Sequence, residues 1–151
     1  MSEGTRVWRL ITNHEYPEEA FQDFVTNGYI AMGWNMAGSV LDYNSPQEIV
    51  DVVRGFPTRN FGLSGKQLFS FCNEIQTGAL VILSDGKSRR AVMRVTDNYE
   101  FRESSEKWAY FHRRKAERTA IDPDLVWKNA GAKPAIGFSM RWPLILLKSK
   151  V

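Results

Sequence analysis

The sequence has little of what a disulfide scaffold, a metal site or a membrane span requires. It contains one cysteine, Cys72, in 151 residues, so no disulfide can form within the chain. It has two histidines, His14 and His112, and no His or Cys cluster with the spacing of metal ligands. No apolar run approaches about 18 residues, and no signal-peptide pattern stands at the N-terminus. These absences predict a soluble, cytoplasmic protein without a membrane partner, in which Cys72 is a small core residue.

Catalytic motifs are also lacking. GLSGKQ at residues 62–67 mimics a phosphate-binding loop, but the full pattern fails at both of its ends. Asp122-Pro123-Asp124 has no nearby acid and lysine of the kind that a metal-dependent nuclease uses, and it indicates a turn. We therefore expect no catalytic residue, no metal and no cofactor. A hydrolase or nuclease with an unrecognised site stays as an alternative.

Charge is unevenly distributed along the chain. Residues 87–118 contain ten Lys or Arg and five acidic residues, a formal charge of +5, whereas the whole chain carries +3. Such asymmetry is typical of a surface that binds a polyanion, and it is equally typical of an ordinary solvated face.

Hydrophobic periodicity predicts one α+β domain. Helical spacing and capping signals predict helices that begin near Pro17, Pro46 and Gly65. Apolar or alternating runs predict strands at residues 6–12, 29–32, 79–83, 91–95, 107–119 and 143–147. Residues 120–135 resemble a long loop. Because consecutive strands without intervening helices pair antiparallel, we expect a curved mixed sheet or open β-barrel of about five or six strands, with the helices beside it.

Aromatic residues are abundant, with five Trp, five Tyr and nine Phe. Trp8 and Trp142 lie within predicted strands and are expected in the core, and Trp127 is expected to cover one end of the sheet. Trp34 and Trp108 differ, because both stand among polar or small residues at the edges of elements. Rings interleaved with cations are typical of nucleic-acid-binding surfaces, where rings stack on bases while Lys and Arg contact phosphates.

The segment RVWRLITNHEYPEEAFQDFVTNGYIAMGW resembles the opening of a PUA-superfamily domain of the EVE and YTH type. Its most specific part is the pairing of Ile11-Thr12-Asn13-His14-Glu15 with Gly33-Trp34. The later VTDNYEF and FHRRKAER segments are similar to the N-terminal modules of McrBC-type modification-dependent restriction proteins. The resemblance covers roughly residues 5–148. It implies a PUA-like, EVE/YTH-like curved mixed sheet or open β-barrel with flanking helices.

In EVE and YTH domains a modified base is flipped into a pocket of aromatic rings. The resemblance places Trp34 on one face of that base, although a core role for Trp34 stays open. It assigns the second ring to Trp108, with Tyr99 or Tyr110 as alternatives.

The resemblance also implies polar contacts. Asn13 would read the base edge, and Ser84 and Asp85 would form the pocket floor. The expected contacts to the nucleic-acid backbone are Lys87, Arg89, Arg90, Arg113, Arg114 and Lys115.

The implied function is non-catalytic recognition of modified DNA by base flipping. N6-methyladenine is the favoured base and a 5-substituted cytosine is the second choice. The domain would target a restriction system whose motor and nuclease subunits are its possible partners. An RNA-binding PUA-type domain is an alternative, and so is a protein–protein adaptor whose aromatic residues all lie in the core.

Overall fold

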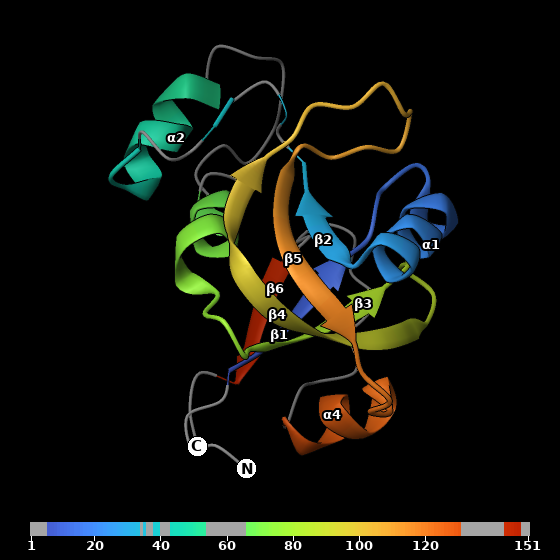
Figure 1. Ribbon diagram of the computed structural model, residues 1–151. Helices are drawn as coiled ribbons and strands as arrows, with labels where there is room; N and C mark the ends of the chain where they lie inside the picture. Colours follow the sequence, from blue (N-terminus) through green and yellow to red (C-terminus); the bar gives the residue numbers. More distant parts are fainter. Residues whose placement is uncertain are drawn as a thin grey trace.

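The computed structural model describes residues 6–33, 35, 38–39, 43–53, 66–130 and 144–148. A mixed β-sheet dominates the fold (Figure 1). Its six strands are β1 (Val7–Ile11), β2 (Tyr29–Met32), β3 (Leu80–Ser84), β4 (Arg89–Phe101), β5 (His112–Arg118) and β6 (Leu144–Lys148). They lie in the order β2-β5-β4-β3-β1-β6.

One strand pair in the sheet is parallel and the others are antiparallel. β1 runs parallel to β3, and on its other side it pairs antiparallel with β6. The long strand β4 changes register against β5 between Val95 and Tyr99, and a shift of this kind bends a strand. Figure 1 shows the resulting curvature of β4 and β5. The expectation of a curved mixed sheet beside helices is therefore confirmed at the level of an α+β fold.

The helices begin close to where the capping signals place them. Helix α1 (Pro17–Asn27) has Pro17 in its first turn and ends at Gly28, whose φ of 74° is left-handed and suits glycine. Helix α2 (Pro46–Val53) follows a capping box in which Ser45 and Glu48 exchange side-chain and backbone hydrogen bonds. Residues 66–69 are helical and continue into a π-helical segment, η3 (Ser70–Glu74). Gly65 lies outside the described residues.

Two clusters of apolar side chains pack the sheet against the helical segments beside it. The larger cluster joins strand residues such as Trp8 to Phe21 and Phe24 of α1 and to Phe71 and Cys72 of η3. The core positions expected for Trp8 and Cys72 are thus confirmed. The smaller cluster lies against helix α4 (Pro123–Asn129) and contains Val7, Ile82, Val92 and Trp127.

Helix α4 corrects the expectation of a loop over residues 120–135. Asp122 is its N-cap, since its carboxylate accepts a hydrogen bond of 2.9 Å from the backbone N–H of Asp124, and Pro123 occupies the first turn. The same three residues had indicated only a turn. The strand expected over residues 107–119 is also shorter, because pairing begins at His112.

Within the described parts of the chain, no helix combines the length and the apolar character needed to cross a membrane.

Candidate functional site

Three segments that are distant in sequence meet at one end of the sheet. They are the turn after β1, the end of β2, and the connection between β4 and β5, residues 102–111. Asn13, in the turn after β1, donates a hydrogen bond of 2.8 Å from Nδ2 to the backbone oxygen of Trp108. The connection lies near the end of β2 in Figure 1. The turn that carries Asn13, the end of β2 and the connection that carries Trp108 are therefore brought together.

The end of β2 is fastened to the same connection. Asn35 donates to the backbone oxygen of Ala109 at 3.1 Å and accepts from the backbone N–H of Phe111 at 2.8 Å. A Cβ at Gly33 would stand 3.3 Å from the Tyr110 ring, so glycine allows the close approach of that ring. Trp34 itself lies outside the described residues. Its expected place as a base platform stays a prediction.

The Asn13 side chain is buried, with 4% of its surface exposed. Its Oδ1 accepts from the backbone N–H groups of Glu15 and Tyr16 at 2.9 and 3.0 Å. The carboxamide therefore shapes the turn into α1 and joins it to the aromatic connection. Among the described residues, one amide hydrogen of Asn13 is left for a ligand.

The half-buried Trp108 ring borders an open groove along α1. This α1 groove has a volume of about 410 Å³. The indole N–H is buried and has no hydrogen-bond partner among the described residues. The groove is lined, besides Trp108, by Glu18, Glu19, Gln22, Asp23, Thr26 and Asn27. Its acidic side chains disfavour a phosphate, whereas the exposed part of the ring suits a neutral flat group.

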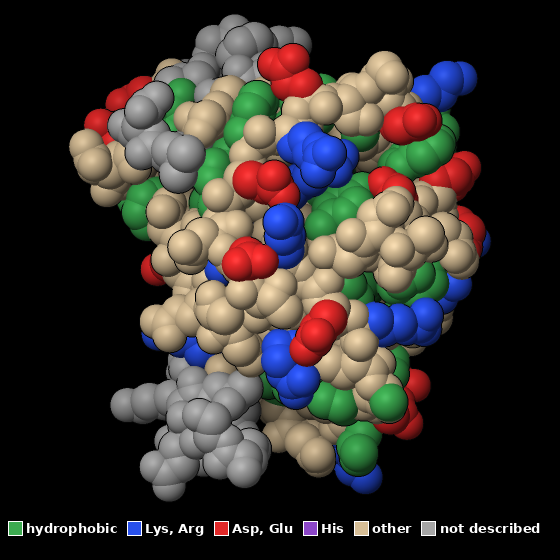
Figure 2. Space-filling model, viewed as in Figure 1, with side chains coloured by type: hydrophobic (Ala, Val, Ile, Leu, Met, Phe, Trp, Pro, Cys, Tyr) green, Lys and Arg blue, Asp and Glu red, His purple; other side chains and the backbone are tan. Residues whose placement is uncertain are grey.

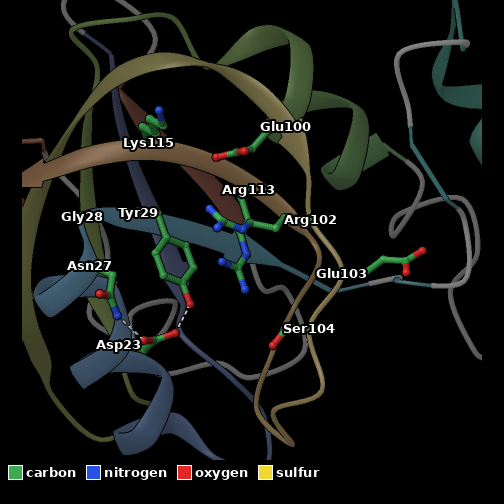
Figure 3. A pocket seen from close by; sticks show the side chains of 10 residues that line it. All are labelled: Asp23, Asn27, Gly28, Tyr29, Glu100, Arg102, Glu103, Ser104, Arg113 and Lys115. Atoms are coloured by element: carbon green, nitrogen blue, oxygen red, sulfur yellow. Dashed lines mark hydrogen bonds between the residues drawn. The ribbon is translucent and has the colours of Figure 1, made fainter.

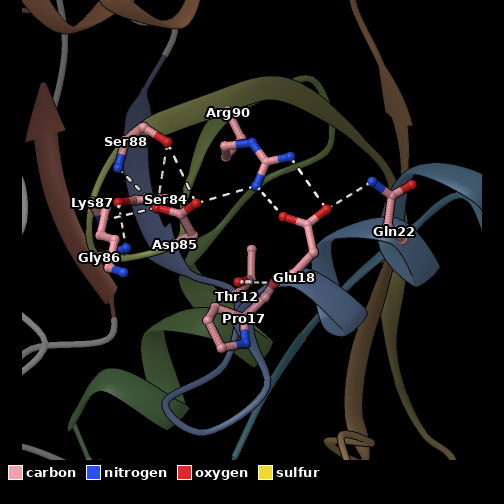
Figure 4. A network of polar contacts seen from close by, with 10 residues as sticks. All are labelled: Thr12, Pro17, Glu18, Gln22, Ser84, Asp85, Gly86, Lys87, Ser88 and Arg90. Carbon is pink, nitrogen blue, oxygen red and sulfur yellow. Dashed lines mark hydrogen bonds and ion pairs between the residues drawn. The ribbon is translucent and has the colours of Figure 1, made fainter.

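Ser84 and Asp85 lie beside the end of β1 but serve a polar network (Figure 4). Ser84 is buried at the end of β3, where its backbone oxygen accepts from the N–H of Thr12 at 3.0 Å. The Asp85 carboxylate forms an ion pair of 3.1 Å with Arg90, which also pairs with Glu18 of α1. This network connects the β3–β4 turn to α1.

The Asp85 carboxylate is also held by its own turn. Burial opposes its charge, but the backbone N–H groups of Lys87 and Ser88, with Arg90, lower the pKa of Asp85 overall. The charged form is thus the one that the folded protein stabilises.

Two of the expected site residues are core residues instead. Tyr99 is 9% exposed, stacks on His112, and has its hydroxyl 2.8 Å from Nδ1 of that histidine. It is therefore not a pocket wall. Arg114 is 2% exposed, and it donates to the backbone oxygens of Asp97 and Phe71 at 2.8 and 3.0 Å. Burial lowers the pKa of Arg114, and a side chain so enclosed does not reach a phosphate.

The remaining cations expected to contact the nucleic-acid backbone differ in the contacts that their side chains make within the protein. Arg89 pairs with Asp124 and lies over the Trp127 ring, with 4.9 Å between its guanidinium carbon and the ring centroid. Arg90 takes part in the network of Figure 4. Lys87 and Lys115 are exposed. On the face in Figure 2, basic side chains lie over the middle of the molecule with acidic side chains next to them.

A second polar cavity opens beside α1, β2, β4 and β5 (Figure 3). This β2–β5 cavity has a volume of about 410 Å³. Arg113 and Lys115 are the lining residues that were expected from the sequence, and Tyr29 and Arg102 are among the others. Arg102 belongs to the basic segment, but only the strand pairing places it near Tyr29. The cavity is lined by Asp23, Asn27, Gly28, Tyr29, Glu100, Arg102, Glu103, Ser104, Arg113 and Lys115.

No group of three or more His, Cys, Asp or Glu side chains among the described residues is arranged to hold a metal ion. Both histidines contact tyrosine hydroxyls, His14 that of Tyr110 at 3.4 Å and His112 that of Tyr99 at 2.8 Å.

Comparison with known proteins identifies one family. No curated protein and no solved structure matches the chain. The model of the family described as "Domain of unknown function (DUF8426)" matches residues 8–132. This segment runs from β1 to just beyond α4 and includes both cavities. Because the match covers most of its 151 residues, the chain belongs to the DUF8426 family.

Proposed function

We propose that this protein binds DNA that carries a modified base, and that the base leaves the duplex to stack at the meeting point of β1, β2 and residues 102–111. The observation that carries the proposal is the hydrogen bond between Asn13 and the backbone of Trp108. It joins the polar turn after β1 to the backbone of the segment that carries Trp108, which supports the arrangement expected from the resemblance to EVE and YTH domains. The proposal includes a PUA-like form of the sheet.

In such a site the free-energy cost of extruding the base is close to the gain from stacking it on aromatic rings. Extruding a base costs a few kcal/mol, about as much as one or two stacked rings return at roughly 1–3 kcal/mol each. A methyl group that enters an apolar contact adds about 0.8 kcal/mol. Trp108 supplies one ring in this proposal and Trp34 supplies the other. The methyl group then decides between marked and unmarked DNA.

The charges around Trp108 support entry by a base rather than by the backbone. Glu18, Glu19 and Asp23 line the α1 groove and repel phosphates. The exocyclic amine of adenine or cytosine is a hydrogen-bond donor and tolerates carboxylates nearby. N6-methyladenine is the favoured base because its amine carries the methyl group, and a 5-substituted cytosine is the second choice.

The proposal is tested with fluorescent oligonucleotides at one fixed salt concentration. The panel contains one DNA duplex sequence in three forms, unmodified, with N6-methyladenine and with 5-methylcytosine, and the same sequence as RNA. We expect the tightest binding to a modified duplex. Equal affinity for all duplexes would overturn base recognition, and preferred binding of RNA would favour the RNA-binding alternative.

The catalytic alternative has a separate readout. Incubation of the same oligonucleotides with the protein and divalent cations, followed by electrophoresis, detects cleavage. We expect the oligonucleotides to remain intact, since the proposed role is recognition without catalysis, with motor and nuclease subunits as possible partners.

A further inference from the structure

Two basic side chains of the β2–β5 cavity, Arg102 and Arg113, lie next to each other in Figure 3, and Lys115 lies further from them. Arg102 follows the end of β4, whereas Arg113 and Lys115 stand on β5. The Arg113 guanidinium lies over the Tyr29 ring, with 4.3 Å between its central carbon and the ring centroid. Its Nε donates to the backbone oxygen of Tyr110 at 3.3 Å. These contacts fix the guanidinium while its terminal nitrogens stay available.

The cavity cations have no carboxylate partner within the described part of the chain. The ion pairs found there involve Arg89, Arg90 and Arg94, and none involves Arg102, Arg113 or Lys115. This is unexpected for Arg113, since Glu100 is its cross-strand neighbour. Unpaired cations gathered around a cavity are typical of an anion site.

Of the three acidic residues of the cavity, Asp23 and Glu103 are disposed so that an anion can enter, whereas Glu100 is the cross-strand neighbour of Arg113. The Asp23 carboxylate already accepts from the Tyr29 hydroxyl and the Asn27 amide. Glu103 lies apart from the two guanidinium groups in Figure 3. Burial and the hydrogen bond to Asp23 raise the pKa of Tyr29, which keeps its hydroxyl neutral. The positive charges of Arg113 and Arg102 lower the pKa of the same hydroxyl, which is consistent with their closeness to it.

We infer that the β2–β5 cavity binds a phosphate group between Arg102 and Arg113, with Lys115 at its edge. Planar guanidinium groups bind phosphate oxygens through paired hydrogen bonds, and a lysine adds a point charge. The inference rests on the proposed function only for the source of the phosphate, which is either a nucleic-acid backbone or a free phosphate ester.

The position of the cavity fits a nucleotide whose base stacks on Trp108. The β2–β5 cavity and the α1 groove share Asp23 and Asn27 in their linings, so they adjoin. The β2–β5 cavity has three basic side chains beside its three acidic ones, whereas the lining of the α1 groove is acidic and aromatic and contains no basic side chain. A phosphate in the first and a base in the second would belong to the same or to neighbouring nucleotides.

The test follows the Nε–Hε signals of arginine by NMR during titration with inorganic phosphate. We expect the signals of Arg102 and Arg113 to shift together with one dissociation constant. The shift at Arg102 should disappear in R113Q. Its control is R94Q, which removes the same charge from an exposed position on β4. A melting curve of each variant shows that it is folded, and K115Q repeats the test while keeping the contact of Arg113 with the Tyr29 ring.

The second arm measures DNA affinity against salt concentration. Each phosphate contact that is lost should lower the slope of log K against log salt by about one, so R113Q and K115Q should each lose about that much and R94Q none. An unmoved Arg113 signal at saturating phosphate, or an equal loss in R94Q, would overturn the inference. If modified DNA is preferred while phosphate moves neither signal, the cavity assignment fails and the proposed function stands. If phosphate binds in the cavity but no oligonucleotide binds, the proposed function fails and the ligand is a free phosphate ester.

Discussion

Asn13 donates a hydrogen bond of 2.8 Å to the backbone oxygen of Trp108, a residue 95 positions further along the chain. The same carboxamide accepts two backbone N–H bonds at the entrance to α1. One buried side chain therefore sets both the turn after β1 and the position of the aromatic connection. A change at Asn13 should affect both parts together.

Replacing Asn13 by alanine should lower the free energy of unfolding by about 1–3 kcal/mol, because backbone groups at a buried site lose their partner. Thermal melting checks this, with about 2–4 °C expected for each kcal/mol. Asn13→Asp keeps the two acceptor bonds but sets a carboxylate oxygen against the backbone oxygen of Trp108 at a buried site. It should therefore also be less stable than the wild type. Unchanged melting of the alanine variant would contradict a structural role.

Trp108→Ala should weaken binding of the modified duplex by about 5–150-fold, which corresponds to the loss of roughly 1–3 kcal/mol of stacking. Trp108→Phe keeps a ring and should retain most of the affinity. A fluorescence titration per folded molecule makes the comparison. Equal affinity of the alanine variant and the wild type would remove Trp108 from the base site.

Arg114→Met should destabilise the fold by about 2–4 kcal/mol, because the buried carbonyl of Phe71 and that of Asp97 lose their donor. Its neighbour Lys115 is exposed, so Lys115→Met should change stability by no more than about 0.5 kcal/mol. Urea denaturation of both variants gives the difference. Salt dependence of DNA binding should show the reverse order, with an effect of Lys115→Met alone. A fully stable Arg114→Met protein would contradict the core assignment.

Trp127→Ala should cost about 3–5 kcal/mol, the range for truncating a large buried aromatic side chain. Trp127 belongs to the cluster between α4 and the sheet, whereas Leu125 on the same helix is 53% exposed. Leu125→Ala should therefore be neutral within about 0.5 kcal/mol. Chemical denaturation of the pair tests whether α4 is packed as described, and two equal small effects would argue against it.

Stability should fall as acid neutralises Asp85. Its pKa is lowered in the folded protein, so its contribution is fully present above the ordinary aspartate pKa of about 3.9 and is lost as pH falls through the lower folded value. Asp85→Asn should be less stable than the wild type at pH 7, and the two melting curves should converge at low pH. Asp51→Asn, an exposed position on α2, is the control and should keep the wild-type pH dependence.

Local signals in the sequence were sufficient to predict α1 and the start of α2. Pro17, Gly28 and the Ser45 capping box act within a few residues of their own positions, so they predict those boundaries directly. Helix α4 was missed although Asp122 and Pro123 carry a normal N-terminal signal. Its seven residues offer too short an apolar pattern to distinguish a helix from a loop.

The candidate site depends on contacts between distant segments, which local sequence signals do not predict. A buried arginine such as Arg114 has the same sequence context as the cavity residue Arg113 beside it. Strand alternation separates them, because Arg114 faces the core while Arg113 faces Tyr29. The side of the strand is fixed by the pairing of β2 with β5, across 80 or more residues of sequence, as with Ile30 and Arg114. No pattern within one segment contains that information.

The placement of β1 between β3 and β6 has a consequence for how the chain acquires its fold. Trp8 pairs with Val81 on one side and with Leu146 on the other. A nascent chain therefore cannot satisfy both edges of β1 until β6, the last of the described strands, has been synthesised. Contacts of such long sequence separation slow folding, and the edge of β1 that pairs with β6 stays unpaired until then. Completion of the sheet is thus a late step in folding.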